Sequence, residues 1–193
     1  YHELADLMSA QLFMISEGLL IRAGVTIGKV YLGSQKKGNV FGPGMARAYE
    51  IESKEAVFPR IVVDDNAIRK YAEDPALRAE HHDFEHDAKS VSDLIREGED
   101  GTYYLDYLRY AFEYFDGYKT GLLILSEHYT LISNNIATAK SQAVFRKYAW
   151  LRNYHNRWID ELLSKGIVMD ADDLEVLGEY DEVKKRLESL RLK

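Results

Sequence analysis

The sequence predicts an α/β (α+β) fold with a helical extension at the C-terminal end. Two strand-like runs rich in Val, Ile and Leu, Leu19 to Ile27 and Arg60 to Val63, predict part of a sheet. A helix-forming segment, Met45 to Glu55, lies between these runs. From Tyr107 onward, apolar and aromatic residues recur at helical spacing. The sheet therefore belongs to the first part of the chain, and the helical extension to the rest.

The chain opens with an amphipathic segment, Tyr1 to Ser16, whose apolar residues fall on one face of a helix and are expected to pack on the sheet. Glu17 and Gly18 end this helix, since glycine is the usual residue just past a helix C-terminus. The strand that follows is almost continuously apolar, which is typical of a strand buried on both faces. Arg22 interrupts it, either as a charge at the sheet edge or as a phosphate ligand.

A hairpin and a sharp corner are predicted to connect the first strand to the helix. The polar, glycine-rich stretch Gly33 to Gly38 forms the turn of the hairpin, and the chain returns through Asn39 to Phe41. Gly42 to Gly44 form the corner, where Pro43 suits the first helical turn because its missing N–H needs no partner there. Pro59 closes the helix before the second strand.

Beyond the second strand the pattern becomes helical. Asp64, Asp65 and Asn66 are good N-cap and turn residues. The helix that they begin runs to Ala79, with an interruption at Pro75.

The acidic segment Glu80 to Asp87 contains His82 and His86, which lie four residues apart. On a helix this is the spacing of a metal site, and the alternative is a solvated loop of mixed charge. A strand pair follows, with arms at Ser92 to Arg96 and Thr102 to Leu108, because the EDG tripeptide between them supplies turn chemistry.

The C-terminal part is predicted to consist of helices. A break at Asp116 and Gly117 is followed by one long stretch, Thr120 to Leu163. Its candidate buried residues are Leu123, Tyr129, Ile132, Ile136, Phe145, Tyr148, Leu151 and Trp158. An aromatic stripe at helical spacing indicates a core or a subunit contact. A last amphipathic helix, Asp172 to Leu190, is expected to dock on the rest.

Length and composition narrow the class of protein. The 193 residues fit an α/β domain at 1–110 and a helical extension at 111–193. The net charge of −7 argues against a nucleic-acid partner, and the lack of cysteine excludes disulfides and thiolate metal sites. No apolar run approaches the ~20 residues of a membrane span, so a soluble cytoplasmic protein is expected. Because Tyr1, and not Met, opens a helix in mid-fold, further sequence is expected upstream.

Four motifs, from the first strand-like run through the second, resemble the catalytic domain of class III nucleotidyl cyclases. They read GVTIG, VFG, GPGMARAYEIE and FPRIVVD. The match is closer to the bacterial pyrimidine cyclases of the Pycsar anti-phage system, which are also similar to the later segments EDGTYYLDYL and KYAWLRNYHN. The resemblance covers most of the chain from Leu20 to Asn156. It implies a class III cyclase-like fold, an antiparallel-rich sheet flanked by helices.

The resemblance also implies roles for particular residues. Asn39 stands where the family reads the base, with Phe41 beside it, and its amide offers a donor and an acceptor to a uracil or cytosine edge. The alternative is a hairpin asparagine that tolerates an unusual backbone. The family's transition-state asparagine and arginine correspond to Ala46 and Glu50, which cannot donate hydrogen bonds to a pentavalent phosphate.

Three arginines are candidates to replace the missing donors as catalytic residues. Arg47 is the first choice, because it lies one residue after the vacant asparagine position; the alternative is a solvated helix charge. Arg22 and Arg60 lie on the flanking strands. Arginine suits multidentate contact with phosphate oxygens. Arg96 is the nearest, weak match to the family's phosphate-binding lysine.

The resemblance implies two divalent ions, Mn²⁺ or Mg²⁺, as cofactors. In the family, two aspartates hold them, and the ions activate the ribose 3′-hydroxyl and clamp the triphosphate. The corresponding segments would precede Tyr1, so the metal ligands are expected upstream of this residue. Family active sites form between subunits, which implies a homodimer.

The implied reaction converts UTP, or secondly CTP, to the 3′,5′-cyclic nucleotide and pyrophosphate. The product would be a signal in anti-phage defence that activates a separate effector. Two alternatives remain open. One is a purine cyclase of the same fold, which would carry an acid in place of Asn39. The other is a non-catalytic module for dimerisation or nucleotide sensing, which Ala46 and Glu50 favour.

Overall fold

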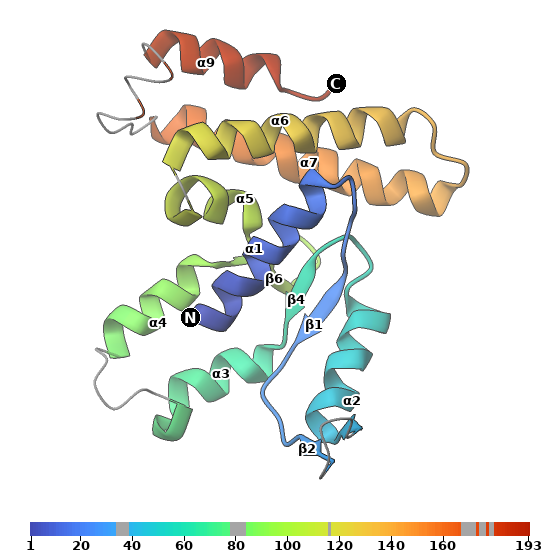
Figure 1. The fold of residues 1–193 in the computed structure, drawn as a ribbon, viewed down its shortest axis with the longest axis vertical. Helices are drawn as coiled ribbons and strands as arrows, with labels where there is room; N and C mark the ends of the chain where they lie inside the picture. The colour runs from blue at the N-terminus through green and yellow to red at the C-terminus, as the bar shows by residue number, and fades with distance from the viewer. Residues whose placement is uncertain (34–38, 78–83, 116, 167–172, 174–176, 178–179) are drawn as a thin grey trace. The chain divides into compact units, whose positions relative to one another are not determined.

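The computed structural model describes residues 1–33, 39–77, 84–115, 117–166, 173, 177 and 180–193 (Figure 1). These residues form two compact units. Unit 1 comprises Tyr1–Leu4 and Ile21–Asp106, and unit 2 comprises Ala5–Leu20 and Tyr107–Lys193. Unit 1 contains the sheet and unit 2 is helical, which agrees with the coarse α/β class. The sequence-based division at residue 110 places Ala5–Leu20 with the sheet, whereas the structure groups this segment with unit 2.

Unit 1 is built on a four-stranded sheet with the strand order β1, β4, β6, β5. The strands are β1 (Ala23–Val25), β4 (Ile61–Val63), β5 (Ile95–Glu97) and β6 (Tyr103–Leu105). β1 and β4 pair in parallel, whereas β6 pairs antiparallel with both β4 and β5. The described sheet is therefore mixed.

β1 is shorter and less buried than the sequence predicts. Only Ala23–Val25 of the run Leu19 to Ile27 pairs as a strand, and all three of its residues are half-buried. The prediction of a strand buried on both faces is wrong, because β1 lies at an edge of the described sheet. β4 has strands on both sides, and Ile61–Val63 are buried at every position.

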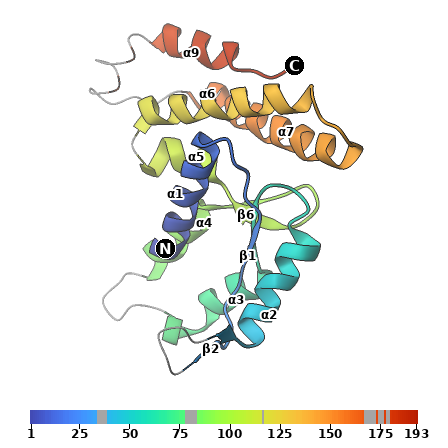
Figure 2. The same ribbon diagram turned by 45° about the vertical axis from the view of Figure 1, so that its right-hand side comes forward.

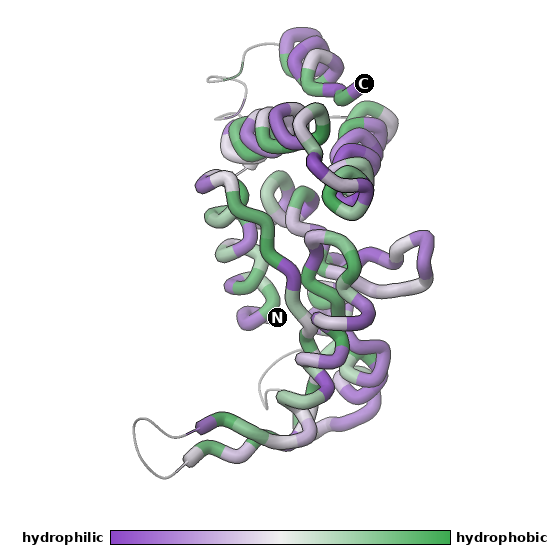
Figure 3. The backbone as a smooth tube through the Cα atoms, turned by 90° about the vertical axis from the view of Figure 1, so that its right-hand side faces the viewer, coloured by the Kyte–Doolittle hydropathy of each residue, from purple (hydrophilic) through white to green (hydrophobic). Residues whose placement is uncertain are grey.

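The predicted hairpin and helix connect β1 to β4. The strands β2 (Tyr31–Leu32) and β3 (Val40–Phe41) pair antiparallel, and their side chains are exposed hydrophobic groups. Figure 3 shows the whole backbone coloured by hydropathy. After Gly42 the chain enters α2 (Pro43–Glu50), with the proline in its first turn. A π-helical turn, Ile51–Glu55, extends the helix. α2 packs against β1 (Figure 2).

Two glycines bring the backbone of β1 and the following loop against α2. A Cβ on Gly24 would lie 2.5 Å from the carbonyl oxygen of Ala48 and 2.7 Å from the Cβ of Ile51. A Cβ on Gly28 would lie 2.6 Å from the Cα of Gly44. These separations leave no room for a side chain, so the start of α2 is fixed close to the carboxyl end of β1.

The helix after β4 begins where the sequence predicts. The carboxylate of Asp64 accepts a hydrogen bond from the backbone N–H of Asn66 and so caps α3 (Asp65–Glu73). Pro75 interrupts the helical pattern as predicted and opens a 3-10 turn, Pro75–Leu77.

The part of the acidic segment Glu80 to Asp87 that the structure describes is helical and not a solvated loop. α4 (Phe84–Asp93) contains the last four residues of that segment, and the acidic Glu85 and Asp87 lie in its first turn, where the helix dipole favours negative charge. His82 lies outside the described residues, so its spacing from His86 is not described.

The second hairpin forms, but its first strand starts later than predicted. Because α4 continues to Asp93, β5 begins at Ile95 rather than at Ser92. The turn closes where the acidic tripeptide predicts it, since the backbone N–H of Gly98 donates to the carbonyl of Thr102 at 2.8 Å.

Helices make up the described part of unit 2. They are α1 (His2–Ser16, from Ala5 onward), α5 (Tyr107–Tyr110) with a π-helical turn (Ala111–Phe115), α6 (Gly117–Ile136), α7 (Gln142–Lys165) and α9 (Tyr180–Ser189). None of the helices in the described ranges is long and apolar enough to cross a membrane. The predicted last helix is described only as α9 and isolated residues before it, and in α9 the side chains of Val183 and Leu187 are buried.

The stretch Thr120 to Leu163 is two helices rather than one. α6 ends at Ile136, and the hydroxyl of Ser141 caps α7 by accepting from the N–H of Val144. The residues between the helices include neither glycine nor proline, so the usual breaker signals are absent from the sequence at this turn.

Two of the predicted core residues of this stretch are exposed. Leu123 is 55% and Phe145 is 40% exposed, whereas Ile132, Leu151 and Trp158 are buried as predicted. The buried side of α6 is instead centred on the neighbours of Leu123, namely Gly121, Leu122, Ile124, Leu125 and His128. The apolar run around Leu123 is too uniform for its spacing alone to reveal the buried face.

A line of hydrogen bonds crosses the interior of unit 2. The hydroxyl of Tyr107 lies 2.9 Å from Nε2 of His128, whose Nδ1 lies 3.0 Å from Nδ1 of His155. Nε2 of His155 lies 2.8 Å from the carbonyl oxygen of Leu190. Because a carbonyl can only accept, neutral His155 carries its proton on Nε2, His128 donates from Nδ1, and Tyr107 donates to Nε2 of His128. Burial lowers the pKa of both histidines, that of His155 to about 4.

Candidate functional site

A cavity of about 710 Å³ lies in unit 1 at the carboxyl ends of the two parallel strands. Thr26 and Ile27 line it just after β1, and Asp64 lines it just after β4. The N-terminal turn of α2, with Pro43 and Gly44, forms another part of the wall. Its volume lies within the range of small-molecule sites, and the carboxyl ends of parallel strands are a common place for ligands in α/β folds.

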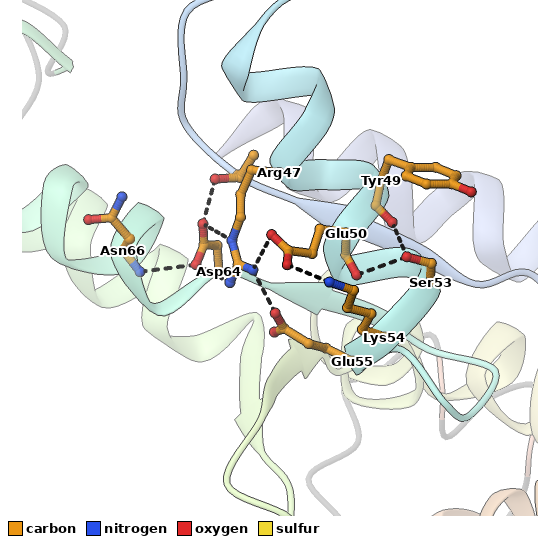
Figure 4. Close-up of polar contacts among 9 residues, drawn as sticks. Arg47, Tyr49, Glu50, Ser53, Lys54, Glu55, Asp64 and Asn66 are labelled. Atoms are coloured by element: carbon orange, nitrogen blue, oxygen red, sulfur yellow. Dashed lines mark hydrogen bonds and ion pairs between the residues drawn. The ribbon is translucent and has the colours of Figure 1, made fainter.

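Asp64 is the most buried charged group of the cavity. Its carboxylate accepts hydrogen bonds from Nε and Nη2 of Arg47 at 3.3 and 3.1 Å and from the N–H of Asn66 (Figure 4). It also accepts one from Oγ1 of Thr26 at 2.6 Å. Burial alone would raise the pKa of Asp64, but the hydrogen bonds from Arg47 and Thr26 outweigh it and lower that pKa. Asp64 is therefore an ionised structural anchor between α2 and α3.

Arg47, the first catalytic candidate, lines the cavity but already binds three carboxylates. Besides Asp64, its guanidinium contacts Glu55 at 2.7 Å and Glu50 at 3.5 Å (Figure 4). The π-helical turn brings Glu55 into reach, eight residues after Arg47. The hydrogen bond to Asp64 is the main cause of a raised pKa of Arg47. All three of its donor nitrogens are engaged.

Glu50, at the position of the family's arginine, faces cations on its own helix. Its carboxylate contacts Nζ of Lys54 at 2.9 Å in addition to Arg47. The hydrogen bond from Lys54 is the main cause of a lowered pKa of Glu50. Together with Ala46, this leaves the helix without the two donors that the family places there.

Three further cations line the cavity, and the sequence did not single them out. Lys29 lies in the loop after β1, and Arg69 and Lys70 lie on α3. Nζ of Lys70 donates to the carbonyl of Ile27 at 3.4 Å, which joins α3 to that loop. The signal that predicts them is topological: residues after two parallel strands meet at one edge of a sheet.

The other two catalytic candidates lie apart from the lining of this cavity. Arg22 is paired with Glu52 at 2.5 Å, as a charge near the sheet edge. Arg60 is fully buried, forms a two-point ion pair with Asp100, and lies over the rings of Phe58 and Tyr104. Burial opposes ionisation of Asp100, but the hydrogen bond from Arg60 prevails and lowers the pKa of Asp100 to about 2.

Arg96, the weak match to the family's lysine, is also engaged in an ion pair. Its Nε donates to the buried carboxylate of Asp106 at 2.6 Å. The side chains of Arg60 and Arg96 thus connect the strands and hairpin of unit 1. Neither residue is among those that line the cavity.

The two predicted base-binding residues lie in the hairpin. Asn39 is exposed, and its carbonyl accepts from the N–H of Gly33. Phe41 is 58% exposed and stacks on Tyr31, with ring centroids 5.5 Å apart. The cavity lining does not include either of them, so the structure does not bring the predicted base and phosphate residues together within unit 1.

The described lining does not fit the two divalent ions that the resemblance implies. The carboxylates of the cavity are Glu55, Asp64 and Asp65, and the first two already bind Arg47. Within the described ranges, no three His, Asp or Glu side chains cluster closely enough to hold a metal ion. The location of the metal ligands upstream of Tyr1 stays a prediction.

The cavity is therefore a cationic pocket that is held together by the Arg47 and Asp64 pair. Its position at the ends of β1 and β4 suits an anionic small molecule. The described part supplies positive charge and backbone groups rather than metal ligands. Comparisons with models of protein families, with curated proteins and with solved structures give no match, so this geometry has to be interpreted from its own residues.

Proposed function

We propose that unit 1 binds a nucleoside triphosphate in this cavity, and that the chain is part of a pyrimidine nucleotide cyclase. The observation that carries the proposal is the cationic cavity at the carboxyl ends of β1 and β4. The motifs of the same segments, which resemble the pyrimidine cyclases, support the choice of nucleotide and reaction.

The charges of the lining favour an anion. Four cationic side chains and three carboxylates line the cavity, which leaves one net positive charge, and Arg47 pairs with two of those carboxylates, Glu55 and Asp64. Lys29, Arg69 and Lys70 then face a single remaining acid, Asp65. In a chain of net charge −7, such a local excess of positive charge attracts a polyphosphate.

The proposed reaction joins the ribose 3′-oxygen of UTP, or of CTP, to the α-phosphorus. The bond from this phosphorus to the oxygen that bridges to the β-phosphate breaks, pyrophosphate leaves with that oxygen, and the 3′-hydroxyl proton passes to water. A homodimer would complete the site, and the cyclic product would activate a separate effector in anti-phage defence.

A second candidate is a nucleotide-sensing module without catalysis. It is favoured by the state of α2, where Arg47 is saturated by carboxylates and Glu50 replaces a donor. Such a site stabilises a bound triphosphate equally before and during reaction, which gives binding without rate enhancement.

One experiment distinguishes these functions. The full chain, together with any natural upstream sequence, is titrated with UTP, CTP, ATP and GTP, and is then incubated with each and manganese while products are resolved by mass. A cyclic pyrimidine nucleotide that disappears when the manganese is chelated supports the pyrimidine cyclase. A cyclic purine nucleotide would instead support a purine cyclase. Binding without turnover supports the sensing module. No binding of any nucleotide would refute both functions.

The base assignment has its own variant. Replacing Asn39 with Ala is expected to loosen discrimination among the four nucleotides, because the amide that would read the base edge is lost. If discrimination is unchanged, Asn39 is a hairpin residue outside the base site. Phe41→Ala is a companion variant, since its exposed ring lies two residues away and stacks on Tyr31.

A further inference from the structure

We infer that Lys29 and Arg69, together with Lys70, hold the phosphate groups of the nucleotide, and that Arg47 does not. The inference rests on the proposed function and assigns the phosphate contacts within the same cavity. It replaces the sequence-based first choice, Arg47, with residues from the loop after β1 and from α3.

Arg47 is unsuited to the task because its release would cost a buried pair. Nε and Nη2 bind Asp64, which is 5% exposed, and Nη1 binds Glu55. Turning the guanidinium toward a phosphate would leave the Asp64 carboxylate buried with Thr26 as its main remaining side-chain donor. The contact that keeps α2 and α3 together would break at the same time.

Lys29 is placed by its backbone and keeps its side chain accessible. The carbonyl of Lys29 accepts from the N–H of Gly44 at 3.0 Å, and the contact between Gly28 and Gly44 fixes the loop against the start of α2. The side chain of Lys29 itself is exposed and, within the described ranges, has no carboxylate partner. A fixed backbone with a mobile ammonium group suits a phosphate contact.

Arg69 approaches the cavity from a different element. It lies in the second turn of α3, whose start is held by the Asp64 cap, and its side chain is exposed without a carboxylate partner among the described residues. The next residue, Lys70, reaches back to the carbonyl of Ile27 in the loop that carries Lys29. The loop after β1 and α3 are thus connected, and both present cations to one cavity. Arginine adds a planar fork that can bind two phosphate oxygens.

The test compares two double variants of equal charge change. K29A/R69A removes both cations from the cavity, and R22A/K54A removes two cations of unit 1 that pair with Glu52 and Glu50 outside the lining. Each variant, and the unchanged full chain, is titrated by calorimetry with UTP, with inorganic triphosphate and with uridine. Circular dichroism of all three proteins checks that they are folded.

K29A/R69A is expected to bind UTP and inorganic triphosphate with at least a roughly tenfold lower affinity, because two charge-assisted contacts are lost. R22A/K54A is expected to change either affinity by about twofold or less, which is the size of a general charge effect. If K29A/R69A binds UTP like the unchanged chain, or if both variants weaken it equally, the inference is overturned. If the unchanged chain binds no nucleotide, the proposed function fails first, and the two failures are distinguishable.

A third variant, K29Q/R69Q, tests the inference if the K29A/R69A protein does not fold. K29Q/R69Q keeps most of each side chain and removes the charge, so it retains the packing of the stems. The same tenfold loss with UTP is expected, and it should shrink as salt is raised because the lost attraction is electrostatic. If UTP binding to K29Q/R69Q depends on salt as strongly as UTP binding to the unchanged chain, the inference is contradicted.

Discussion

Unit 1 and unit 2 bury polar groups in opposite ways. In unit 1 the buried carboxylate of Asp64 stays ionised because Arg47 and Thr26 donate to it, and Asp100 is likewise held by Arg60. In unit 2 the buried His128 and His155 have depressed pKa values and bind each other as neutral rings. Charge is therefore kept in unit 1 where an arginine pairs with the carboxylate, and it is removed in unit 2 where the two buried rings have only each other, a tyrosine hydroxyl and a carbonyl as partners.

The comparison shows what each unit needs from its polar residues. In unit 1 the ion pairs of Arg47 with Asp64 and Glu55 lie in the wall of a cavity, and other cations of the same wall stay exposed. The hydrogen-bond line of unit 2 fixes the C-terminal segment, and Asn156 supports it by bonding both the N–H and the carbonyl of Leu192. Both arrangements satisfy buried groups, but only the first creates an electrostatic site.

The largest effect is expected for His155→Ala in unit 2. The change leaves the Nδ1–H of His128 without its acceptor and the carbonyl of Leu190 without its donor, and it opens a cavity. Together these should lower the free energy of unfolding of unit 2 by about 3–5 kcal/mol.

The measurement is urea unfolding followed by tryptophan fluorescence, because Trp150 and Trp158 both lie on α7 and report on unit 2 alone. His86→Ala, an exposed change on α4 in unit 1, is the control and should leave this transition within about 0.5 kcal/mol. A small effect of His155→Ala would show that the line of hydrogen bonds does not stabilise unit 2.

The next-largest effect is expected at low pH, where the two units should lose stability over different pH ranges. Folding lowers the pKa of His128 and of His155, that of His155 to about 4. In the unfolded chain the pKa of each histidine is about 6.5. At a pH between the unfolded and folded pKa values, the unfolded chain therefore binds more protons than the folded one. Unit 2 should therefore lose about 1.4 kcal/mol per pH unit for each histidine as the pH falls through this window.

Unit 1 should respond only at lower pH. Its carboxylates Asp64 and Asp100 have lowered pKa values, so their contribution is complete above their unfolded values of about 4 and is lost below them, for Asp100 as the pH falls toward about 2. Denaturation at pH 7, 5.5 and 4.5, with tryptophan fluorescence for unit 2 and hydrogen exchange of β4 for unit 1, measures the difference. Parallel losses in both units would contradict the comparison.

Gly28→Ala is expected to have an intermediate effect, confined to unit 1. The added Cβ would meet backbone atoms of Gly44 at 2.6 Å, and backbone cannot move aside as a flexible side chain can. Overpacking of this kind costs about 1–3 kcal/mol and should displace the start of α2. Hydrogen exchange of β4 should rise, while the tryptophan transition of unit 2 stays unchanged.

Gly101→Ala is the matched control, since its Cβ would meet nothing within 4 Å, although its positive φ of 74° strains any side chain. It should cost about 1 kcal/mol through backbone strain alone. Equal effects of the two variants would show that the approach of the glycines does not limit unit 1.

The smallest effect is expected for Arg22→Gln. Its partner Glu52 is a part-exposed residue at the surface of unit 1, and such pairs contribute about 0.2–1 kcal/mol. Hydrogen exchange of β1 and β4 should barely change. Arg60→Ala provides the contrast, because it removes a fully buried side chain that lies over Phe58 and Tyr104 and pairs with the part-exposed Asp100, and it should cost about 2–3 kcal/mol. Similar costs for the two arginines would show that burial does not set the value of these pairs.

Local signals in the sequence predict much of unit 1. The corner at Gly42 to Gly44, the Asp64 cap and the turn before Thr102 are visible because each depends on neighbouring residues. The length of β1 and the engagement of Arg47 depend on partners distant in sequence, and these do not follow from periodicity. Asp64 reads as a helix cap in the sequence, and its second role appears only when β1, α2 and β4 are adjacent.

The candidate site was predicted only in part, because most of its contacts join residues that are distant in sequence. The sequence places an arginine near the cavity, but it cannot show that Glu55 reaches Arg47 through a π-helical turn. Lys29 and Arg69 were missed because exposed basic residues are common and only the parallel pairing of β1 and β4 brings these two together. His128 and His155 carry no signal in the sequence, since a lone histidine on a helix is as often exposed as buried.

The line from Tyr107 to Leu190 has a direction, and the carbonyl at its end sets it. The backbone near the last residue of the chain thus fixes which nitrogen carries the proton on two rings that lie on other helices. A ring N–H shut away from water exchanges slowly and gives a proton resonance outside the crowded amide region of a magnetic resonance spectrum. That resonance would be an intrinsic probe of the docked C-terminal segment, readable without any label.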